Sequence, residues 1–147
     1  MWIRELTPAE CTEVLAAHRL AHLACSMDAC PYIVPIHYAY SDNALNAFSL
    51  PGKKIDCMRA NPHVAALVEV QDRGRGWKSV IVNGHFEELP DRIGFKRQRD
   101  RAWSLLSAHA NWWEPGGLKP NTPEAQPMPP VFFRITIDEI SGRDARQ

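Results

Sequence analysis

Two adjacent lysines, Lys53 and Lys54, stand where the sequence predicts the start of a short helix. They follow the run Phe48-Ser49-Leu50-Pro51-Gly52, in which a strand ends at a hydroxyl side chain and a glycine turn opens the helix. The free backbone N–H groups of a helix start bind anions, and lysines there add to the attraction. Because lysine normally avoids the positive end of a helix, the pair predicts an anionic ligand; the alternative is a solvated cationic turn.

Other reactive side chains form no recognisable catalytic or metal-binding pattern. The four cysteines are scattered and include no Cys-x-x-Cys spacing, so we expect neither a disulfide framework nor a metal site. They are Cys11, Cys25, Cys30 and Cys57. No Ser-His-Asp or paired-carboxylate arrangement favours hydrolysis, and no Gly-x-Gly-x-x-Gly fingerprint predicts a resident nicotinamide dinucleotide.

Apolar segments separated by turn residues predict the strands that position the lysine turn. They are rich in β-branched and aromatic residues, which favour extended structure. They cover residues 20–26, 32–40, 44–49, 63–70, 77–89 and 131–140. Pro35 pushes the second of these strands toward a sheet edge or a bulge.

Helices are predicted at three places around these strands. In the run Thr7-Pro8-Ala9-Glu10, Thr7 can cap, Pro8 suits the first helical position and Glu10 can reach back, so a helix is expected to about residue 17. Two more are expected at 53–59 and 91–108, and the proline-rich stretch 110–130 is expected to be irregular. Six strands with inserted helices and no βαβ alternation predict a mainly β (α+β) antiparallel barrel with peripheral helices.

Length and composition restrict the class of protein further. A chain of 147 residues with 45% hydrophobic and 23% charged residues fits one globular domain spanning 1–147. Lys+Arg and Asp+Glu are both 17, and this balance gives no general field to hold a nucleic acid. No apolar run approaches the roughly 18 residues of a membrane-spanning helix, and the charged N-terminus is unlike a signal peptide. We therefore expect a cytoplasmic protein that binds neither nucleic acid nor membrane.

Four segments of the sequence, in a fixed order, carry a family resemblance. They read Leu23-Ala24-Cys25, Pro31-Tyr32-Ile33-Val34-Pro35-Ile36-His37-Tyr38, Gly52-Lys53-Lys54-Ile55-Asp56-Cys57-Met58-Arg59-Ala60-Asn61-Pro62 and Trp77-Lys78-Ser79-Val80-Ile81-Val82-Asn83-Gly84-His85-Phe86-Glu87-Glu88-Leu89. The ending Phe133-Arg134-Ile135 with Ser141-Gly142-Arg143 adds to them. Together they resemble the FMN-binding split-barrel superfamily of the pyridoxamine 5′-phosphate oxidases, and within it the small nitroimidazole-reductase (Nim)-like proteins.

The resemblance implies a six-stranded antiparallel split β-barrel that forms a homodimer and holds FMN in a groove between the subunits. In such proteins the strand matching residues 35–38 runs along the flavin ring and offers backbone groups to it. Ser49, Lys53 and Lys54 match the positions that hold the phosphate, and Ser79 matches a polar residue that reaches the cofactor. The implied cofactor-binding set is Pro35, Ile36, His37, Tyr38, Phe48, Ser49, Lys53, Lys54, Trp77 and Ser79.

Several of these residues also suit ordinary structural roles. Tyr38 and Phe48 are aromatics that fit a core, and His37 fits a partly exposed strand. The run Asn111-Trp112-Trp113 could cover the partner's flavin, or its two tryptophans could pack in the dimer interface or the core. Phe48 departs from the histidine that many Nim-like relatives have there, and the substrate-phosphate residues of the oxidases are not recognisable.

The activity implied by the resemblance is that of an FMN-dependent oxidoreductase acting on a small organic substrate. The flavin carries the redox chemistry, with NAD(P)H as a transient electron donor, and the catalytic residues are unassigned. Two alternatives remain open at this point. One is a non-catalytic flavin carrier or sensor that reports redox state to a partner, and the other is a split barrel that binds haem or a deazaflavin.

Overall fold

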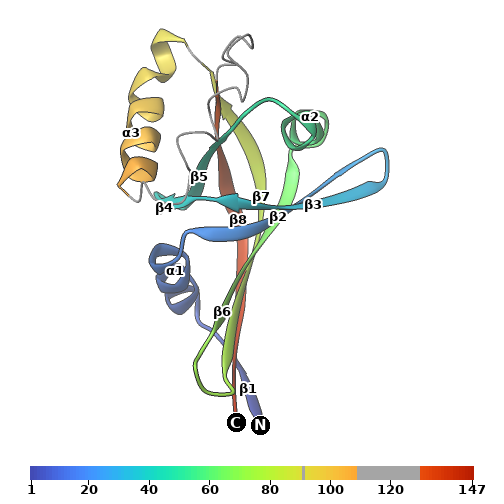
Figure 1. Cartoon of the computed structure of the whole chain (residues 1–147), viewed down its shortest axis with the longest axis vertical. Helices are drawn as coiled ribbons and strands as arrows, with labels where there is room; N and C mark the ends of the chain where they lie inside the picture. Colours follow the sequence, from blue (N-terminus) through green and yellow to red (C-terminus); the bar gives the residue numbers. More distant parts are fainter. Residues whose placement is uncertain (91, 109–129) are drawn as a thin grey trace, which may run out of the picture.

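The strands of the molecule pair in one antiparallel sheet whose strand order differs from the chain order (Figure 1). The computed structural model describes residues 1–90, 92–108 and 130–147. The order is β3-β2-β6-β7-β8-β5-β4, with β1 paired to β8. The strands are β1 (Trp2–Glu5), β2 (Leu20–Met27), β3 (Cys30–His37), β4 (Ala39–Ser41), β5 (Ala44–Ser49), β6 (His63–Gln71), β7 (Trp77–Leu89) and β8 (Val131–Arg146).

The two strands that end this order, β3 and β4, are consecutive in the chain and are separated by Tyr38 alone. One stretch of chain therefore pairs with β2 through β3 and with β5 through β4. No ladder joins the two end strands to each other in the described part of the chain, so the sheet curves without closing. This is the architecture of a split barrel.

Two short turns fix the register of the hairpins that flank Tyr38. Asp28 and Ala29 join β2 to β3 with φ angles of 53° and 59°, and Asp42 and Asn43 join β4 to β5 with 51° and 58°. Two successive residues with positive φ are typical of the two-residue hairpin turn whose twist matches that of the strands. The turn expected at residues 41–43 is confirmed.

The longest pairing is the β7–β8 ribbon, which runs from the pair Trp77–Ala145 to the pair Leu89–Phe132. Its register shifts at Asn83 and Gly84, where the ribbon carries a bulge. A Cβ atom at Gly84 would collide with the carbonyl oxygen of Thr136, so a side chain cannot be accommodated at this bulge without moving the backbone.

Alternation along the strands directs one side of the sheet into a hydrophobic core. The fully buried side chains of this core include Leu15, Leu23, Tyr38, Ile55 and Phe133. A smaller cluster lies under the third helix and consists of Ala39, Phe48, Leu89, Ala102, Leu106 and Phe132. The two clusters lie on different sides of β5, since Leu45 belongs to the first and Phe48 to the second.

Within the described residues, three α-helices surround the sheet: α1 (Pro8–Ala17), α2 (Lys53–Ala60) and α3 (Lys96–Ser107). A short 3-10 turn, η1 (Ile93–Phe95), precedes α3. The predicted capping box is present, because Thr7 Oγ1 accepts from the Glu10 backbone N–H at 3.2 Å while Glu10 Oε2 accepts from the Thr7 N–H at 2.8 Å. Figure 1 shows α2 and α3 at the same end of the barrel but on opposite sides of it. No helix in the described ranges is long and apolar enough to span a membrane.

The predicted fold class is confirmed, with differences in detail. Eight strands are present in the described residues instead of six, because Trp2–Glu5 forms an edge strand and the expected strand 32–40 breaks at Tyr38. The last strand continues to Arg146, beyond the expected end at residue 140, since its C-terminal part pairs with β1 as well as β7. The expected helix 91–108 begins as a 3-10 turn, and the irregular stretch 110–130 lies almost wholly outside the described residues.

Candidate functional site

Lys54, in the first turn of α2, is partly buried and has no anionic partner among the described residues. Its side chain forms no ion pair or hydrogen bond with any described residue, whereas Arg4, Arg59 and Arg134 each bind a carboxylate. Burial lowers the pKa of Lys54, and only the nearby Cys25 side chain acts in the opposite direction. A desolvated ammonium group without a counter-ion is costly, so the site suits an anion supplied from outside the chain.

The surroundings of Lys54 do not supply that anion. Cys25 on β2 and Cys57 on α2 are buried and close enough for their thiols to share a hydrogen bond. Burial, followed by the contact with Cys57, raises the pKa of Cys25, so this thiol stays neutral at physiological pH. The neighbouring groups therefore leave the positive charge of Lys54 uncompensated.

The start of α2 adds backbone donors to the two lysines. Gly52 occupies the position before the helix, has an extended backbone and offers no side chain to cap the first turn. Uncapped N–H groups and the positive end of the helix dipole both favour an anion at this point. The hydroxyl of Ser49, at the end of β5, donates to the carbonyl of Leu50 at 3.0 Å. In this orientation the hydroxyl proton is not available to a phosphate.

Lys53 lies in a different environment from Lys54, although the two are adjacent in sequence. Its side chain is exposed, and its Nζ atom stands 4.6 Å from the centre of the Tyr32 ring. Tyr32 lies on β3, opposite Cys25 of β2 in the strand register. Lys54 is thus partly buried and Lys53 exposed to solvent. Tyr32 joins the candidate site, although it is not among the site residues predicted from the sequence.

The predicted flavin strand presents alternate residues to opposite sides of the sheet. Pro35 and His37 face outward, whereas the side chains of Ile36 and Tyr38 are buried in the core. The Tyr38 hydroxyl donates to the carbonyl of Leu15 at 2.8 Å, and burial raises its pKa. Ile36 and Tyr38 can therefore offer only backbone groups to a ligand, while Pro35 and His37 can also offer side chains. Burial lowers the pKa of His37, which favours its neutral form.

Trp77 and Ser79 lie on the same outward surface as Pro35 and His37, but not next to them. Strands β2 and β6 stand between β3 and β7 in the sheet order. Three inter-strand spacings of roughly 4.8 Å separate the two groups by about 14 Å. Within one chain, the predicted flavin-binding residues thus form two separate groups on one surface.

This surface, here called the outer face, is apolar where a single chain would be exposed to water. Leu20, Ile33, Trp77 and Ile81 are 46%, 66%, 38% and 44% exposed. Two of the hollows on the outer face contain predicted site residues. A cavity of about 420 Å³ is lined by His18, Arg19, Leu20, His22, His37, Glu69 and Gln71. Another of about 480 Å³ is lined by Glu5, Leu6, Trp77, Ser79, Ile81, Ile140, Ser141, Gly142 and Arg143.

Phe48 differs from the other predicted site residues because it is packed inside the second cluster. Its ring lies 5.5 Å from that of Phe132 and 5.7 Å from that of Trp103 on α3, measured between ring centres. The side chain is 9% exposed, so it has little surface to offer a ligand. Trp112 and Trp113 lie outside the described residues.

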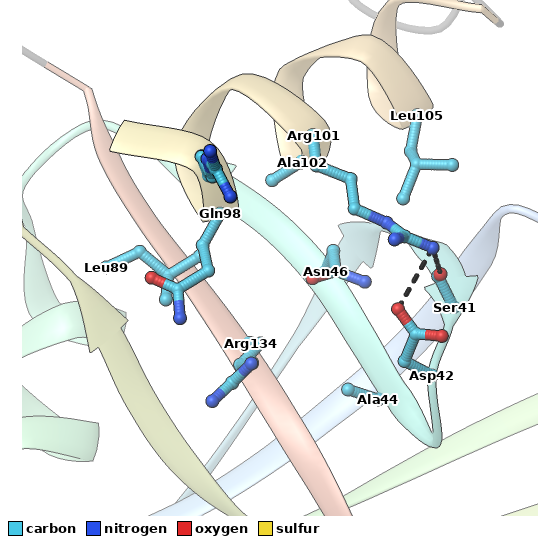
Figure 2. Close-up of a pocket in the computed structure, with 11 residues that line it drawn as sticks. Ser41, Asp42, Ala44, Asn46, Leu89, Gln98, Arg101, Ala102, Leu105 and Arg134 are labelled. Atoms are coloured by element: carbon cyan, nitrogen blue, oxygen red, sulfur yellow. Dashed lines mark hydrogen bonds and ion pairs between the residues drawn. The ribbon is translucent and has the colours of Figure 1, made fainter. Parts of the chain in front are cut away.

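A further cavity, of about 270 Å³, lies between α3 and strands β4 and β5 and contains none of the predicted site residues (Figure 2). Arg101 reaches across it from α3, donating to Ser41 Oγ at 3.0 Å and pairing with Asp42 Oδ2 at 3.0 Å. Asn46 and Arg134 line the opposite wall. Since Arg101 and Arg134 are each paired with a carboxylate, this cavity has less unmatched charge than the α2 start.

Comparisons with known proteins agree with this architecture. A family model described as "Pyridoxamine 5'-phosphate oxidase" matches residues 7–144. An uncharacterized protein of Rhizobium meliloti (strain 1021) is 49% identical over 146 residues, which cover 99% of this chain and 97% of that relative.

Solved structures of other proteins have the same fold. A protein from Mesorhizobium loti described as FAD-binding is 56% identical, with a TM-score of 0.85 over 99% of this chain and 100% of that chain. A protein from Bacteroides thetaiotaomicron described as a 5-nitroimidazole antibiotic resistance protein has a TM-score of 0.72 at 13% identity, over 98% of this chain and 89% of that chain. The second likeness concerns the fold alone.

Proposed function

Because the chain belongs to the pyridoxamine 5′-phosphate oxidase family, as its sequence segments predicted, we propose that it binds a flavin nucleotide and acts as a flavin-dependent oxidoreductase on a small organic substrate. The bound flavin supplies the hydride and electron chemistry. The residues of this chain bind the nucleotide, orient it and shield its ring from water.

The observation that carries this proposal is the unpaired, partly buried ammonium group of Lys54 at the uncapped start of α2. A flavin nucleotide carries its negative charge on phosphate, which a ribityl chain separates from the flavin ring. The Lys54 charge, the α2 backbone amides and the helix dipole together suit such a phosphate. Its binding restores to Lys54 the counter-charge that the described residues do not provide.

The ring end of the nucleotide is assigned to the outward side of β3. Pro35 lies three residues along β3 from Tyr32, which is roughly 10 Å at 3.3 Å per residue. The distance leaves room between an anion held at α2 and a flat ring placed against Pro35 and His37. Because Tyr32 faces the core side of β3 and Pro35 faces outward, the ligand would pass around the edge of β3, which ends the strand order. Backbone groups of Ile36 and Tyr38 remain available there even though their side chains are buried.

A homodimer explains why the predicted residues fall into two groups on the outer face. A two-fold axis that lies between the two groups would bring each group against the other group of the second subunit. Trp77 and Ser79 of one subunit would then lie beside Pro35 and His37 of the other. The exposed apolar residues Leu20, Ile33 and Ile81 support this arrangement because they would be covered in it.

The flavin is FMN or FAD, and the two differ only beyond the first phosphate. The family resemblance favours FMN, whereas the Mesorhizobium loti relative is described as FAD-binding. Lys54 would hold the phosphate that both nucleotides share, so the proposal does not depend on which one is bound. Heat release of the bound flavin followed by chromatography identifies the nucleotide.

The visible spectrum of the purified protein and the affinity of one variant test the proposal. We expect flavin absorption bands without a Soret band, which would instead indicate haem. Lys54→Ala should weaken flavin binding roughly 10- to 100-fold, the effect of losing a hydrogen bond to a charged group. Lys96→Ala, at an exposed position on α3, is the matched control and should leave the affinity unchanged. Equal affinities of the two variants would remove Lys54 from the site.

Rapid mixing with NADH or NADPH separates an enzyme from a flavin carrier. An oxidoreductase of the proposed kind should show bleaching of the oxidised flavin by one of the two nucleotides, followed by reoxidation when a small acceptor is added. A bound flavin that neither nucleotide reduces would favour a carrier or sensor. Light scattering tests the dimer, because a flavin-loaded monomer would contradict a shared site.

A further inference from the structure

We propose that Lys53, held against the ring of Tyr32, binds the second phosphate of FAD and makes the site prefer FAD to FMN. This inference rests on the proposed function, since it assigns a role to a residue beside the flavin phosphate site. The resemblance groups Lys53 with Lys54 as ligands of one phosphate. The structure divides the two lysines between different environments, and the division suits a pyrophosphate.

The two cations differ in burial and in what holds them. Lys54 is partly buried, with its pKa lowered by desolvation, whereas Lys53 is exposed. The Lys53 ammonium lies 4.6 Å from the centre of the Tyr32 ring, within the range of a cation–π contact. This contact limits the positions that a flexible lysine side chain explores without cancelling its charge. The ammonium is thus positioned and still able to bind an anion.

The chemistry of the two nucleotides matches this arrangement. FMN ends in a single phosphate, which one buried cation and the amides of the α2 start can hold. FAD continues from that phosphate to a second, singly charged phosphate and then to adenosine. A second cation placed next to the first, but nearer to solvent, stabilises FAD and adds little to the binding of FMN.

Acidic groups near this position do not compete for Lys53. Asp56, in the first turn of α2, forms no ion pair with either lysine, and the next carboxylate of that region, Glu88, binds Arg59 through two hydrogen bonds of 2.7 and 2.9 Å. Asp28, in the β2–β3 turn, is exposed and likewise forms no ion pair within the described ranges. Lys53 therefore keeps its charge available for a ligand.

A competition experiment on the full-length protein tests the assignment without relying on activity. The purified protein is dialysed against an equimolar mixture of FMN and FAD, and the bound flavins are released by heat and separated by chromatography. Two readouts follow, the total flavin per chain and the ratio of FAD to FMN. Wild-type protein, Lys53→Ala, Lys54→Ala, Tyr32→Leu and Tyr32→Phe are compared, with Lys96→Ala as the control.

The two lysine variants should change different readouts. Lys53→Ala should lower the FAD:FMN ratio about 10-fold, as expected for one lost charge-assisted hydrogen bond, while the total flavin stays close to that of wild type. Lys54→Ala should lower the total and leave the ratio unchanged. Tyr32→Leu should lower the ratio by about 2- to 5-fold through loss of the cation–π contact, and Tyr32→Phe, which keeps the ring, should not.

The outcomes that overturn the inference differ from those that overturn the proposed function. Equal binding of FMN and FAD by wild type, or a loss of total flavin in Lys53→Ala at an unchanged ratio, would place both lysines on one phosphate. A ratio lowered equally by Tyr32→Phe and Tyr32→Leu would remove the ring from the argument. Absence of both flavins from the wild-type protein would instead reject the flavin site itself.

Discussion

The first turn of α2 and the β7–β8 ribbon are both rich in charged groups, but they differ in whether those groups form ion pairs within the chain. Along the ribbon, Arg134 of β8 binds Glu87 of β7, and His85 Nδ1 lies 3.1 Å from Asp138 Oδ1. At α2, neither Lys53 nor Lys54 has a carboxylate partner among the described residues. The ribbon satisfies its charges within the chain, and the α2 turn leaves its charges for a ligand.

The difference shows how a chain with no net charge can still bind an anion at one place. Paired groups of opposite sign cancel at short range and contribute modestly to stability. Two unpaired cations beside an uncapped helix start produce a local field that the overall charge does not reveal. Changes in the ribbon should therefore alter stability, and changes at the α2 turn should alter ligand affinity.

The largest expected effect is on the ribbon, at Gly84. Gly84→Ala places a Cβ atom against the Thr136 carbonyl at the bulge and should lower the free energy of unfolding by about 3 kcal/mol. Gly74→Ala, where a Cβ atom meets nothing within 4 Å, is the control and should be near neutral. Urea unfolding followed by tryptophan fluorescence measures both. Similar stabilities of the two variants would mean that the bulge tolerates a side chain.

The next effect separates affinity from stability at α2. Lys54→Met keeps the length of the side chain, removes its charge and should weaken flavin binding roughly 10- to 100-fold. Since desolvation lowers the pKa of Lys54 in the folded state, its charged form is destabilising there, and its removal should not lower the stability of the flavin-free protein. Thermal unfolding with and without flavin gives both quantities. A flavin-free variant that unfolds more easily than wild type would indicate an unseen structural partner.

A smaller effect is expected from the ion pair of the ribbon. Partial burial raises the pKa of Glu87, but the hydrogen bond and charge of Arg134 outweigh it, and the pKa is lowered overall. Both side chains are more than a third exposed, so Glu87→Gln should cost only about 0.5–1 kcal/mol of unfolding free energy. The affinity for flavin should not change, and a large loss of affinity would contradict the division between the two regions.

The smallest effect is the pH dependence contributed by His85. The hydrogen bond with Asp138, together with Glu87, raises the pKa of His85 above 6.5 in the folded protein. The stabilisation is then complete below the unfolded pKa and is lost as pH rises through the folded pKa. Unfolding free energies at about pH 5.5 and about pH 8.5 should differ less in His85→Gln than in wild type. An unchanged difference would assign the pH dependence to other groups.

Much of the fold could be predicted because its signals are local. The Thr7–Glu10 capping box and the alternation along β7 are determined by neighbouring residues, and both were predicted. Strand β1 was missed, because Trp2–Glu5 carries mixed charge and is extended only through its pairing with residues 143–146 of β8. The break at Tyr38 was missed for the same reason, since the core and α1 determine it.

The candidate site was predictable in its chemistry but not in its arrangement. Lysines at a helix start indicate an anion, and the structure places Lys53 and Lys54 at the start of α2 as expected. The sequence could not show that their environments differ, because Tyr32 comes from a strand twenty-one residues earlier in the chain. Nor could it show that Phe48 is packed under α3, which depends on Trp103 and Phe132.

Tyr38 has a consequence for how faithfully the ring-binding strand is positioned. Slippage of β3 by one residue would exchange its two faces, burying Pro35 and His37 and exposing Ile36. The backbone N–H of Tyr38 donates to the carbonyl of Arg19 at 2.9 Å, and its hydroxyl donates to that of Leu15. These two bonds attach the end of the strand to the last turn of α1 and to the segment that follows it, and a one-residue slip would move Tyr38 away from both acceptors. Tyr38 thereby fixes the register of β3, so that Pro35 and His37 face the ligand in every folded molecule.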